Sequence, residues 1–310
     1  MGNQTEQQSG IMYAASAYIL WGFLPFYWKL LDHIGAEEIL ANRVLWSCLF
    51  MLLLLFLTKK WSLLVKTLRG FANNKRQLVA LCVASVLISI NWFVYIWGVN
   101  SGQMVETSLG YYINPLVSVL LGVIFFKEKL SHAQIISFLL ATIGVLIMTL
   151  SYGSFPWIAI TLALTFGLYG MAKKLIKMDS AVGLALETMV VTPIAILYIW
   201  LVIGPANELI TDGGSTSVLL IGAGAATAVP LLFFAKGAQR IPLSLLGFLQ
   251  YIAPTIMLIL GIFVYHETFS KSDLLAFIFI WSALTIYSVS KTKLVSNLEM
   301  KWRKEKSTHI

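Results

Sequence analysis

The chain has 310 residues, of which 58% are hydrophobic and 12% charged, and its mean hydropathy is +0.82. A soluble chain carries about twice that share of charged residues, so the composition excludes an ordinary soluble protein and indicates an integral membrane protein. The two cysteines, Cys48 and Cys82, lie inside apolar runs, so neither a disulfide framework nor a zinc site is expected.

Ten apolar stretches are long enough to cross a bilayer as helices, which takes about 17–25 residues each. They cover residues 11–28, 38–57, 77–98, 104–126, 133–150, 155–171, 181–203, 218–234, 243–265 and 272–289. The first stretch contains Pro25, and residues 1–10 carry no Lys or Arg, so no cleaved signal peptide is expected. The sequence therefore predicts an all-α integral membrane protein with ten transmembrane helices.

The Lys and Arg residues predict how these spans are oriented. Nineteen fall in segments on the side of the N-terminus, the opposite loops hold only Lys29 and Lys271, and Arg43 lies within a span. This bias predicts that both termini are cytoplasmic in a multi-pass protein of the cell (inner or plasma) membrane. Orientation therefore explains the net charge of +8, and the basic tail is expected to face water or lipid rather than nucleic acid.

An internal repeat with a constant offset of 139 residues joins the two halves of the chain. It pairs Tyr112 with Tyr251, Pro115 with Pro254, Gly122 with Gly261 and Glu128 with Glu267. The repetition in register indicates that an ancestral unit was duplicated. Each proline lies inside a span and removes one backbone hydrogen bond, so Pro115 and Pro254 are predicted hinges.

The duplication predicts the domain organisation. We expect an N-terminal tail at 1–10, a first repeat at 11–151, a second repeat at 152–289 and a basic C-terminal tail at 290–310. Because each half carries five spans, an odd number, the second half is expected to be inverted relative to the first. Inverted repeats are the usual frame for alternating access, although a duplication can also build a bundle without a transport role.

Motifs of enzymes are absent from the sequence. The four histidines are too scattered for metal-ligand spacing, and no phosphate-binding loop, nucleophile elbow or His-x-x-Glu-His pattern occurs. The small residues Gly222–Ala223–Gly224 are better explained by close helix packing than by phosphate binding. We therefore expect no catalytic residues, no metal and no cofactor, and any uphill transport would use an ion gradient, with protons as the candidate ion.

Polar and large aromatic residues inside the spans are the candidates for a substrate cavity, because intramembrane polar groups are costly. These candidates are Trp21, Asn91, Trp92, Tyr95, Tyr111, Asn114, Gln250 and Tyr251. The two halves differ here, since Tyr111 and Asn114 correspond to Gln250 and Ala253. A site for an asymmetric molecule would show such a difference. The alternative, that these groups only join helices by hydrogen bonds, carries similar weight.

Two ionisable residues, Arg43 and Glu187, lie deeper, each about six residues into its predicted span. At ~1.5 Å rise per residue, each is roughly 9 Å below its own surface. Because the repeats are inverted, the two lie near opposite faces and are not expected to pair. Glu187 is a candidate for proton coupling or for binding a substrate amine; alternatively it snorkels to water or bonds Thr188 or a neighbouring helix.

Arg43 also has two interpretations. It could bind a carboxylate or phosphate of the substrate, or it could form a structural ion pair with Asp32, Glu37 or Glu38. The three acids are close in sequence, which slightly favours the structural interpretation.

Several strings in the chain resemble the signatures of one known family. They lie at residues 18–29, 38–47, 91–97, 108–116 and 247–254 and read YILWGFLPFYWK, EILANRVLWS, NWFVYIW, SLGYYINPL and GFLQYIAP. These strings are similar to those of RarD-type (chloramphenicol-sensitive) proteins, in the EamA branch of the drug/metabolite transporter superfamily. The likeness covers about residues 11–287 and implies a ten-helix inner-membrane permease of two EamA repeats with a central cavity, generally assigned to efflux.

Architecture and resemblance together predict a secondary transporter that exports a small metabolite or drug by alternating access. Its expected partners are a small-molecule substrate and the lipid bilayer, with no nucleic acid. A flippase for a lipid-linked head group is the alternative. An integral-membrane enzyme is disfavoured, because the sequence shows no cluster of His or Asp at one membrane surface. The substrate, the coupling ion and the oligomeric state stay open.

Overall fold

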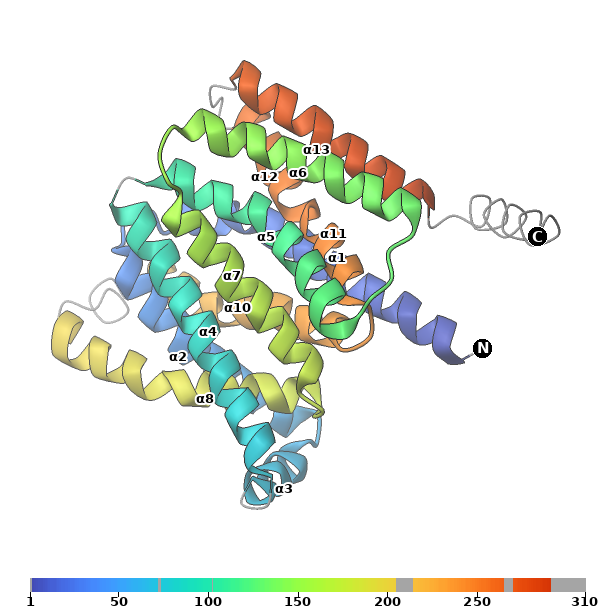
Figure 1. Cartoon of the computed structure of the whole chain (residues 1–310). Helices are drawn as coiled ribbons and strands as arrows, with labels where there is room; N and C mark the ends of the chain where they lie inside the picture. Colours follow the sequence, from blue (N-terminus) through green and yellow to red (C-terminus); the bar gives the residue numbers. More distant parts are fainter. Residues whose placement is uncertain (1, 72–73, 102, 205–213, 265–269, 291–310) are drawn as a thin grey trace.

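The computed structural model describes residues 2–71, 74–101, 103–204, 214–264 and 270–290. Within these ranges the protein is built of helices without a strand, and ten helical spans are long and apolar enough to cross a membrane (Figure 1). The predicted fold class is thus confirmed. The basic tail lies almost wholly outside the described residues.

The first half of the chain forms six helices. They are α1 (Gly2–Lys29), α2 (Ala36–Leu57), α3 (Trp61–Gly70), α4 (Lys75–Asn100), α5 (Met104–Phe126) and α6 (His132–Tyr152). Helix α3 is too short to span a membrane, and the sequence predicts only a connecting segment between the second and third spans. Its single buried residue, Leu64, faces the bundle, whereas Lys66 and Arg69 are exposed. This pattern is typical of a helix that lies along a membrane surface.

The second half repeats the arrangement of the spans, and the stretch that corresponds to α3 falls at residues 205–213, outside the described residues. Its helices are α7 (Trp157–Leu175), α8 (Ser180–Tyr198), α10 (Ser215–Ala238), α11 (Leu243–Gln250), α12 (Ile252–Phe263) and α13 (Lys271–Ser290), and α8 continues as the π-helical turn η1 (Ile199–Ile203). The ninth predicted span is therefore two helices. Their junction at Tyr251 lies three residues before Pro254, which has no N–H to give to the carbonyl of Gln250. Helix α5 runs through Pro115 without such a break.

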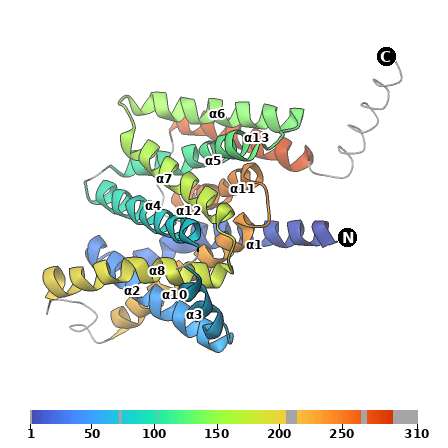
Figure 2. The same cartoon turned by 60° about the horizontal axis from the view of Figure 1, so that its bottom comes forward.

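Contacts between the helices follow a two-fold pattern. Helices α1, α2, α4 and α5 of the first repeat correspond to α7, α8, α10 and α11–α12 of the second. Accordingly, α1 contacts α10 as α7 contacts α4, and α2 contacts α10 as α8 contacts α4. In the same way, α1 contacts α12 as α7 contacts α5. Three further contacts, α2 with α8, α5 with α11 and α6 with α13, join equivalent helices. Figures 1 and 2 both show α6 and α13 side by side at one edge. Two five-span repeats related in this way form one domain, with the second inverted relative to the first.

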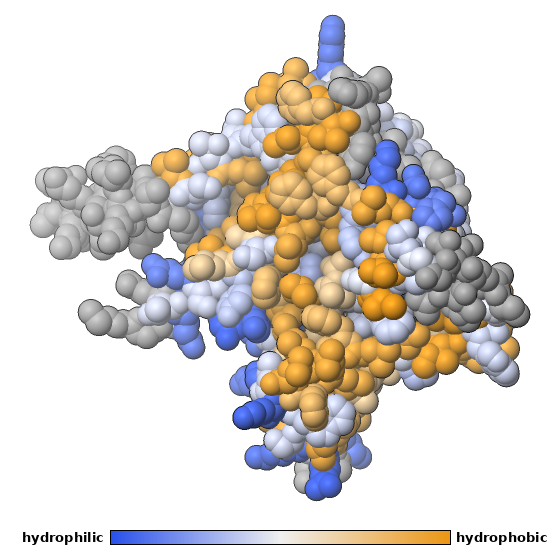
Figure 3. All heavy atoms as spheres, turned by 180° about the vertical axis from the view of Figure 1, so that it is seen from behind, coloured by the Kyte–Doolittle hydropathy of each residue, from blue (hydrophilic) through white to orange (hydrophobic). Residues whose placement is uncertain are grey.

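The end of the bundle that carries α3 also holds the starts of α4, α8 and α11 and the ends of α5, α7 and α10. We call it the basic end, because most Lys and Arg residues of the described chain lie there. Figure 3 shows hydrophobic residues across the middle of one face and hydrophilic residues mainly at its margins. Such a surface is suited to a bilayer, where apolar side chains face lipid.

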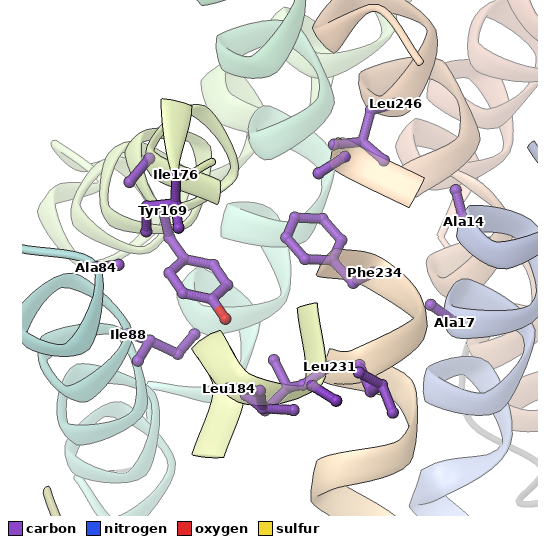
Figure 4. Packing of buried hydrophobic residues seen from close by; sticks show 14 of the residues in the cluster. Ala14, Ala17, Ala84, Ile88, Tyr169, Ile176, Leu184, Leu231, Phe234 and Leu246 are labelled. Atoms are coloured by element: carbon purple, nitrogen blue, oxygen red, sulfur yellow. The ribbon is translucent and has the colours of Figure 1, made fainter. Parts of the chain in front are cut away.

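Aromatic rings fill the centre of the bundle. Trp21 of α1 contacts Phe166 of α7 and Phe234 of α10, with ring centroids 5.7 Å apart in both cases. The ring of Tyr169 stacks on Phe234 at 5.8 Å (Figure 4). These rings come from both repeats and are held among buried aliphatic residues such as Leu231. The candidate residue Trp21 is thus part of the packing between the repeats.

Candidate functional site

Arg43 of α2 lies between two indole rings. Its guanidinium carbon is 5.3 Å from the ring centre of Trp28, at the end of α1, and 4.8 Å from that of Trp92, in α4. Both distances are within the range of a cation–π interaction, which stabilises a charge that has left water. Helices α1, α2 and α4 therefore meet around this cation at the end of the bundle opposite the basic end.

Two tyrosines complete the surroundings of Arg43. Tyr95 of α4 and Tyr111 of α5 have ring centres 6.0 Å apart, and both lie close enough to the guanidinium to interact with it electrostatically. Tyr111 keeps 39% of its surface exposed. Because Arg43 and Tyr95 both flank it, we interpret that exposed surface as facing the space between helices. Three candidates from the sequence, Trp92, Tyr95 and Tyr111, are thus brought together around Arg43.

The structure does not provide the ion pair that was slightly favoured for Arg43. Within the described ranges, no carboxylate lies within salt-bridge distance of its guanidinium, and its Nε is buried without a hydrogen-bond partner. Glu37 and Glu38 lie in the first turn of α2, more than one turn before Arg43, which directs them toward the helix end. Proximity in sequence was therefore a poor guide here.

The second repeat places an ion pair at the equivalent position. Nζ of Lys173, in α7, donates to both carboxylate oxygens of Glu187, in α8, at 2.6 Å. The hydroxyl of Tyr169 donates to the same carboxylate at 3.2 Å. Both charged side chains are only 3% exposed. Of the alternatives for Glu187, the structure shows the bond to a neighbouring helix.

Sequence reasoning missed Lys173. The sixth span was expected to end near residue 171, so Lys173 and Lys174 were both counted as loop residues. Helix α7 continues to Leu175, and Lys173 is buried while Lys174 is partly exposed. The helical spacing offers a signal, because Lys173 lies four residues after Tyr169 and therefore shares its face.

A small cavity lies beside Glu187 and Tyr169 and is bordered by Trp92 of the Arg43 surroundings. Ser47 of α2 and Thr188 of α8 add hydroxyl groups to its lining. The lining combines helices of both repeats, namely α2 and α4 with α7, α8 and α10.

Three other predicted cavity residues form bonds between helices. Asn91 of α4 donates to the carbonyl of Leu162 and to the hydroxyl of Thr165 in α7, both at 2.9 Å. Gln250 donates to Ser118 at 3.1 Å, and Tyr251 donates to the carbonyl of Tyr112 at 3.3 Å. These contacts match the alternative that such groups join helices.

Asn114 differs from these three. It is 7% exposed, and its Oδ1 is buried without a hydrogen-bond partner among the described residues. It follows Tyr111 by three residues on α5 and so lies on the same helix face. A buried acceptor without a partner is unusual in a folded protein and suits a group that binds a ligand.

Close packing positions α2, the helix of Arg43. Gly224 of α10 lies directly against the backbone of Trp46, where a Cβ atom would clash. The Ser47 hydroxyl donates to the carbonyl of Gly224 at 3.1 Å. The prediction that the small residues of this stretch serve helix packing is confirmed.

The basic end is closed by bonds between the repeats. The carboxylate of Glu128, at the end of α5, accepts from the backbone N–H groups of Leu243 and Ser244, at 2.7 and 2.8 Å, and so caps α11. Lys174 donates to the carbonyl of Ile241 at 2.6 Å. Lys60, after α2, pairs with Asp179, before α8, at 2.6 Å. Glu267, the equivalent of Glu128 in the second repeat, lies outside the described residues.

Ten apolar spans in two repeats, packed around a polar and aromatic centre, are the architecture of a multi-pass membrane transport protein. The family comparison agrees, because the model of the EamA-like transporter family matches the chain twice, over residues 8–150 and 155–289. The chain belongs to this family.

Curated relatives cover nearly the whole chain. An uncharacterized transporter of Bacillus subtilis, YojE, is 47% identical over 98% of this chain and 99% of its own length. The protein RarD of Escherichia coli is 41% identical over 92% of this chain and 94% of its own. The RarD resemblance is therefore confirmed, and the name of YojE describes that relative as a transporter. A crystal structure with 18% identity shares the fold, with a TM-score of 0.70 over 94% of this chain and 99% of that one.

Proposed function

We propose that the protein is a secondary transporter that exports a small metabolite or drug by alternating access of its two repeats. The observation that carries the proposal is the two-fold pattern of helix contacts around a centre lined by both repeats. In such a frame, exchanging the conformations of the two halves opens the central site first to one side and then to the other.

The excess of Lys and Arg at the basic end supports a cytoplasmic location for that end in the cell membrane. The bonds of Glu128, Lys174 and Lys60 then close the cytoplasmic side in this conformation. Export requires these bonds to break, so that substrate can enter from the cytoplasm. A flippase would need a cavity that opens sideways to lipid. The central cavity is lined by helices of both repeats, as a transport path shared by the two halves requires.

A cross-link across the basic end tests alternating access. We replace Lys60 and Asp179 by cysteine in a protein whose native Cys48 and Cys82 are serine, and form the disulfide by mild oxidation. Everted membrane vesicles are then assayed for accumulation of a metabolite panel, with and without a proton gradient. Oxidation is expected to abolish accumulation, and a reductant is expected to restore it.

The single variant Lys60→Cys, treated in the same way, controls for oxidation damage. Undiminished transport by the fully cross-linked protein would contradict alternating access. Orientation is checked with Ser154→Cys in the same background, since the loop between α6 and α7 is expected outside. An impermeant maleimide should label Ser154→Cys in intact cells, and labelling only after lysis would reverse the assignment.

Protons are the coupling ion in this proposal, and Glu187 is the group to test. A buried carboxylate that exchanges Lys173 for a proton would couple transport to the gradient. In that case Glu187→Gln should transport with no dependence on pH. If the ion pair is only structural, the variant should show less folded protein, and its remaining transport should keep the pH dependence of the unmodified protein.

A further inference from the structure

Arg43 carries a charge that no carboxylate of the described residues pairs with. Holding a cation inside a bundle costs free energy unless a carboxylate or several acceptors compensate it. Glu187, at the equivalent position of the second repeat, has Lys173 and Tyr169 as partners. Among the described residues, no carboxylate lies within salt-bridge distance of the Arg43 guanidinium. The intramembrane carboxylate of Glu106 instead accepts from the N–H of Ile158 at 2.6 Å.

The contacts that Arg43 does make leave its donors available. Cation–π contacts with Trp28 and Trp92 use the positive charge and none of the N–H groups. A guanidinium presents five such groups in a rigid fork that matches a carboxylate or phosphate bidentately. The two indoles therefore hold the side chain in place, and its fork is free to bind an oxyanion.

The neighbours of the fork suit the rest of an organic anion. Tyr111 exposes 39% of its surface beside Arg43, and Tyr95 lies against it. Further along the same face of α5, Asn114 offers an acceptor that no described residue uses. Within the described part of the chain, an aromatic wall lies beside a cation and an acceptor that have no hydrogen-bonding or ion-pair partner. This combination fits a molecule with an anionic end, a flat apolar part and a hydrogen-bond donor.

We propose that Arg43 binds the oxyanion of the transported molecule, a carboxylate or a phosphate, between Trp28 and Trp92. The transported class is then a small organic anion, and this assignment rests on the proposed transport function. The anion completes in the first repeat the charge pair that Lys173 and Glu187 form within the second.

Binding to the purified protein in lipid nanodiscs tests the proposal without a transport assay. The probes are benzoate, phenyl phosphate and the neutral benzamide, and tryptophan fluorescence reports binding because Trp28 and Trp92 flank the site. We expect benzoate or phenyl phosphate to bind at least about tenfold more tightly than benzamide, since a charge-assisted bidentate bond is lost in the amide. Which of the two anions binds more tightly distinguishes a carboxylate site from a phosphate site.

Variants test whether the binding of the anion depends on Arg43. Arg43→Gln should weaken binding of the preferred anion about 10- to 100-fold and leave benzamide unchanged. Arg43→Lys keeps the charge without the fork and should fall between. The matched control is Arg240→Gln, because Arg240 also stacks on a ring, that of Tyr13 at 5.6 Å, but at the basic end. Arg240→Gln should bind the anion as the unmodified protein does.

Two results would overturn the assignment. One is equal affinity of the unmodified protein for benzoate, phenyl phosphate and benzamide, which needs no variant to fold. The other is an Arg43→Gln protein that still transports its compound at the normal rate, and this outcome would leave the transport function standing. Conversely, the protein could bind the anion through Arg43 and yet transport nothing in vesicles. This result would support the binding site and count against the transport function.

Discussion

Arg43 and Glu187 each lie seven residues after the first residue of equivalent helices, Ala36 of α2 and Ser180 of α8. The carboxylate in the second repeat is neutralised within the bundle by a lysine 2.6 Å away. Among the described residues, the guanidinium in the first repeat lies against the faces of Trp28 and Trp92 and near Tyr95 and Tyr111, with no carboxylate in salt-bridge distance. Within the described residues, the charge of Glu187 is therefore paired and the charge of Arg43 is not. The difference teaches that equivalent positions in the two copies of a duplicated scaffold can carry opposite charges that are compensated in different ways.

The largest expected effect, on the free energy of unfolding, comes from removing one partner of the buried ion pair of Lys173 and Glu187. Lys173→Met or Glu187→Met alone should each lower the free energy of unfolding by about 3–5 kcal/mol, because each leaves one charge buried without its partner. The double variant should lose less than either single variant, since two methionines of similar volume remove both charges. Unfolding by titration with SDS measures all three. Losses that simply add in the double variant would show that the pair is not the source of the effect.

The second prediction gives Arg43 a carboxylate partner within the protein, as Lys173 has in Glu187. Tyr111→Glu introduces a carboxylate close to Arg43, where it should occupy the guanidinium and compete with a bound anion. Benzoate or phenyl phosphate binding should weaken about tenfold or more, with the variant folded as judged by gel filtration. Tyr111→Gln is the matched control because it changes the same ring without adding a charge. Equal losses in both variants would assign the effect to the missing ring.

The smallest effect is expected at the partly exposed ion pair of Lys60 and Asp179, which provides a comparison for the buried pair of Lys173 and Glu187. Burial alone would raise the pKa of Asp179, but the hydrogen bond from Lys60 and the backbone N–H groups of Val182 and Ala181 lower it overall. A lowered pKa means that this stabilisation is present above the ordinary value of 3.8 and is lost as the pH falls below it.

Lys60→Met should therefore cost less than about 1 kcal/mol near pH 7, since partly exposed pairs contribute little. The difference in Tm between the variant and the unmodified protein should shrink as the pH approaches 3. Lys59→Met, in the adjacent exposed position, controls for the loss of one positive charge. A difference that grew on acidification would contradict the assigned direction of the pKa shift.

The amino-acid sequence by itself determined the architecture. The ten apolar stretches predicted the ten spans, and the offset that pairs Pro115 with Pro254 predicted two repeats. Both follow from local rules, because a bilayer forces any spanning backbone to satisfy its own hydrogen bonds as a helix. The sequence also identified Arg43 and Glu187 as the deep charges and predicted that they would not pair with each other. The ion pair of Glu187 with Lys173 agrees with that prediction.

Only the tertiary structure decided what each polar group contacts. The sequence treated Asn91 and Asn114 alike, yet α7 uses the amide of Asn91 while Oδ1 of Asn114 has no described partner. The sequence placed Lys173 in a loop and favoured an ion pair of Arg43 with the acids nearest in the chain. Distance along the chain is the only distance that it provides. Partners across a bundle are set by which helix faces meet and at what depth. The meeting of helix faces depends on how the two repeats pack, and this packing cannot be read from residues that are adjacent in the chain.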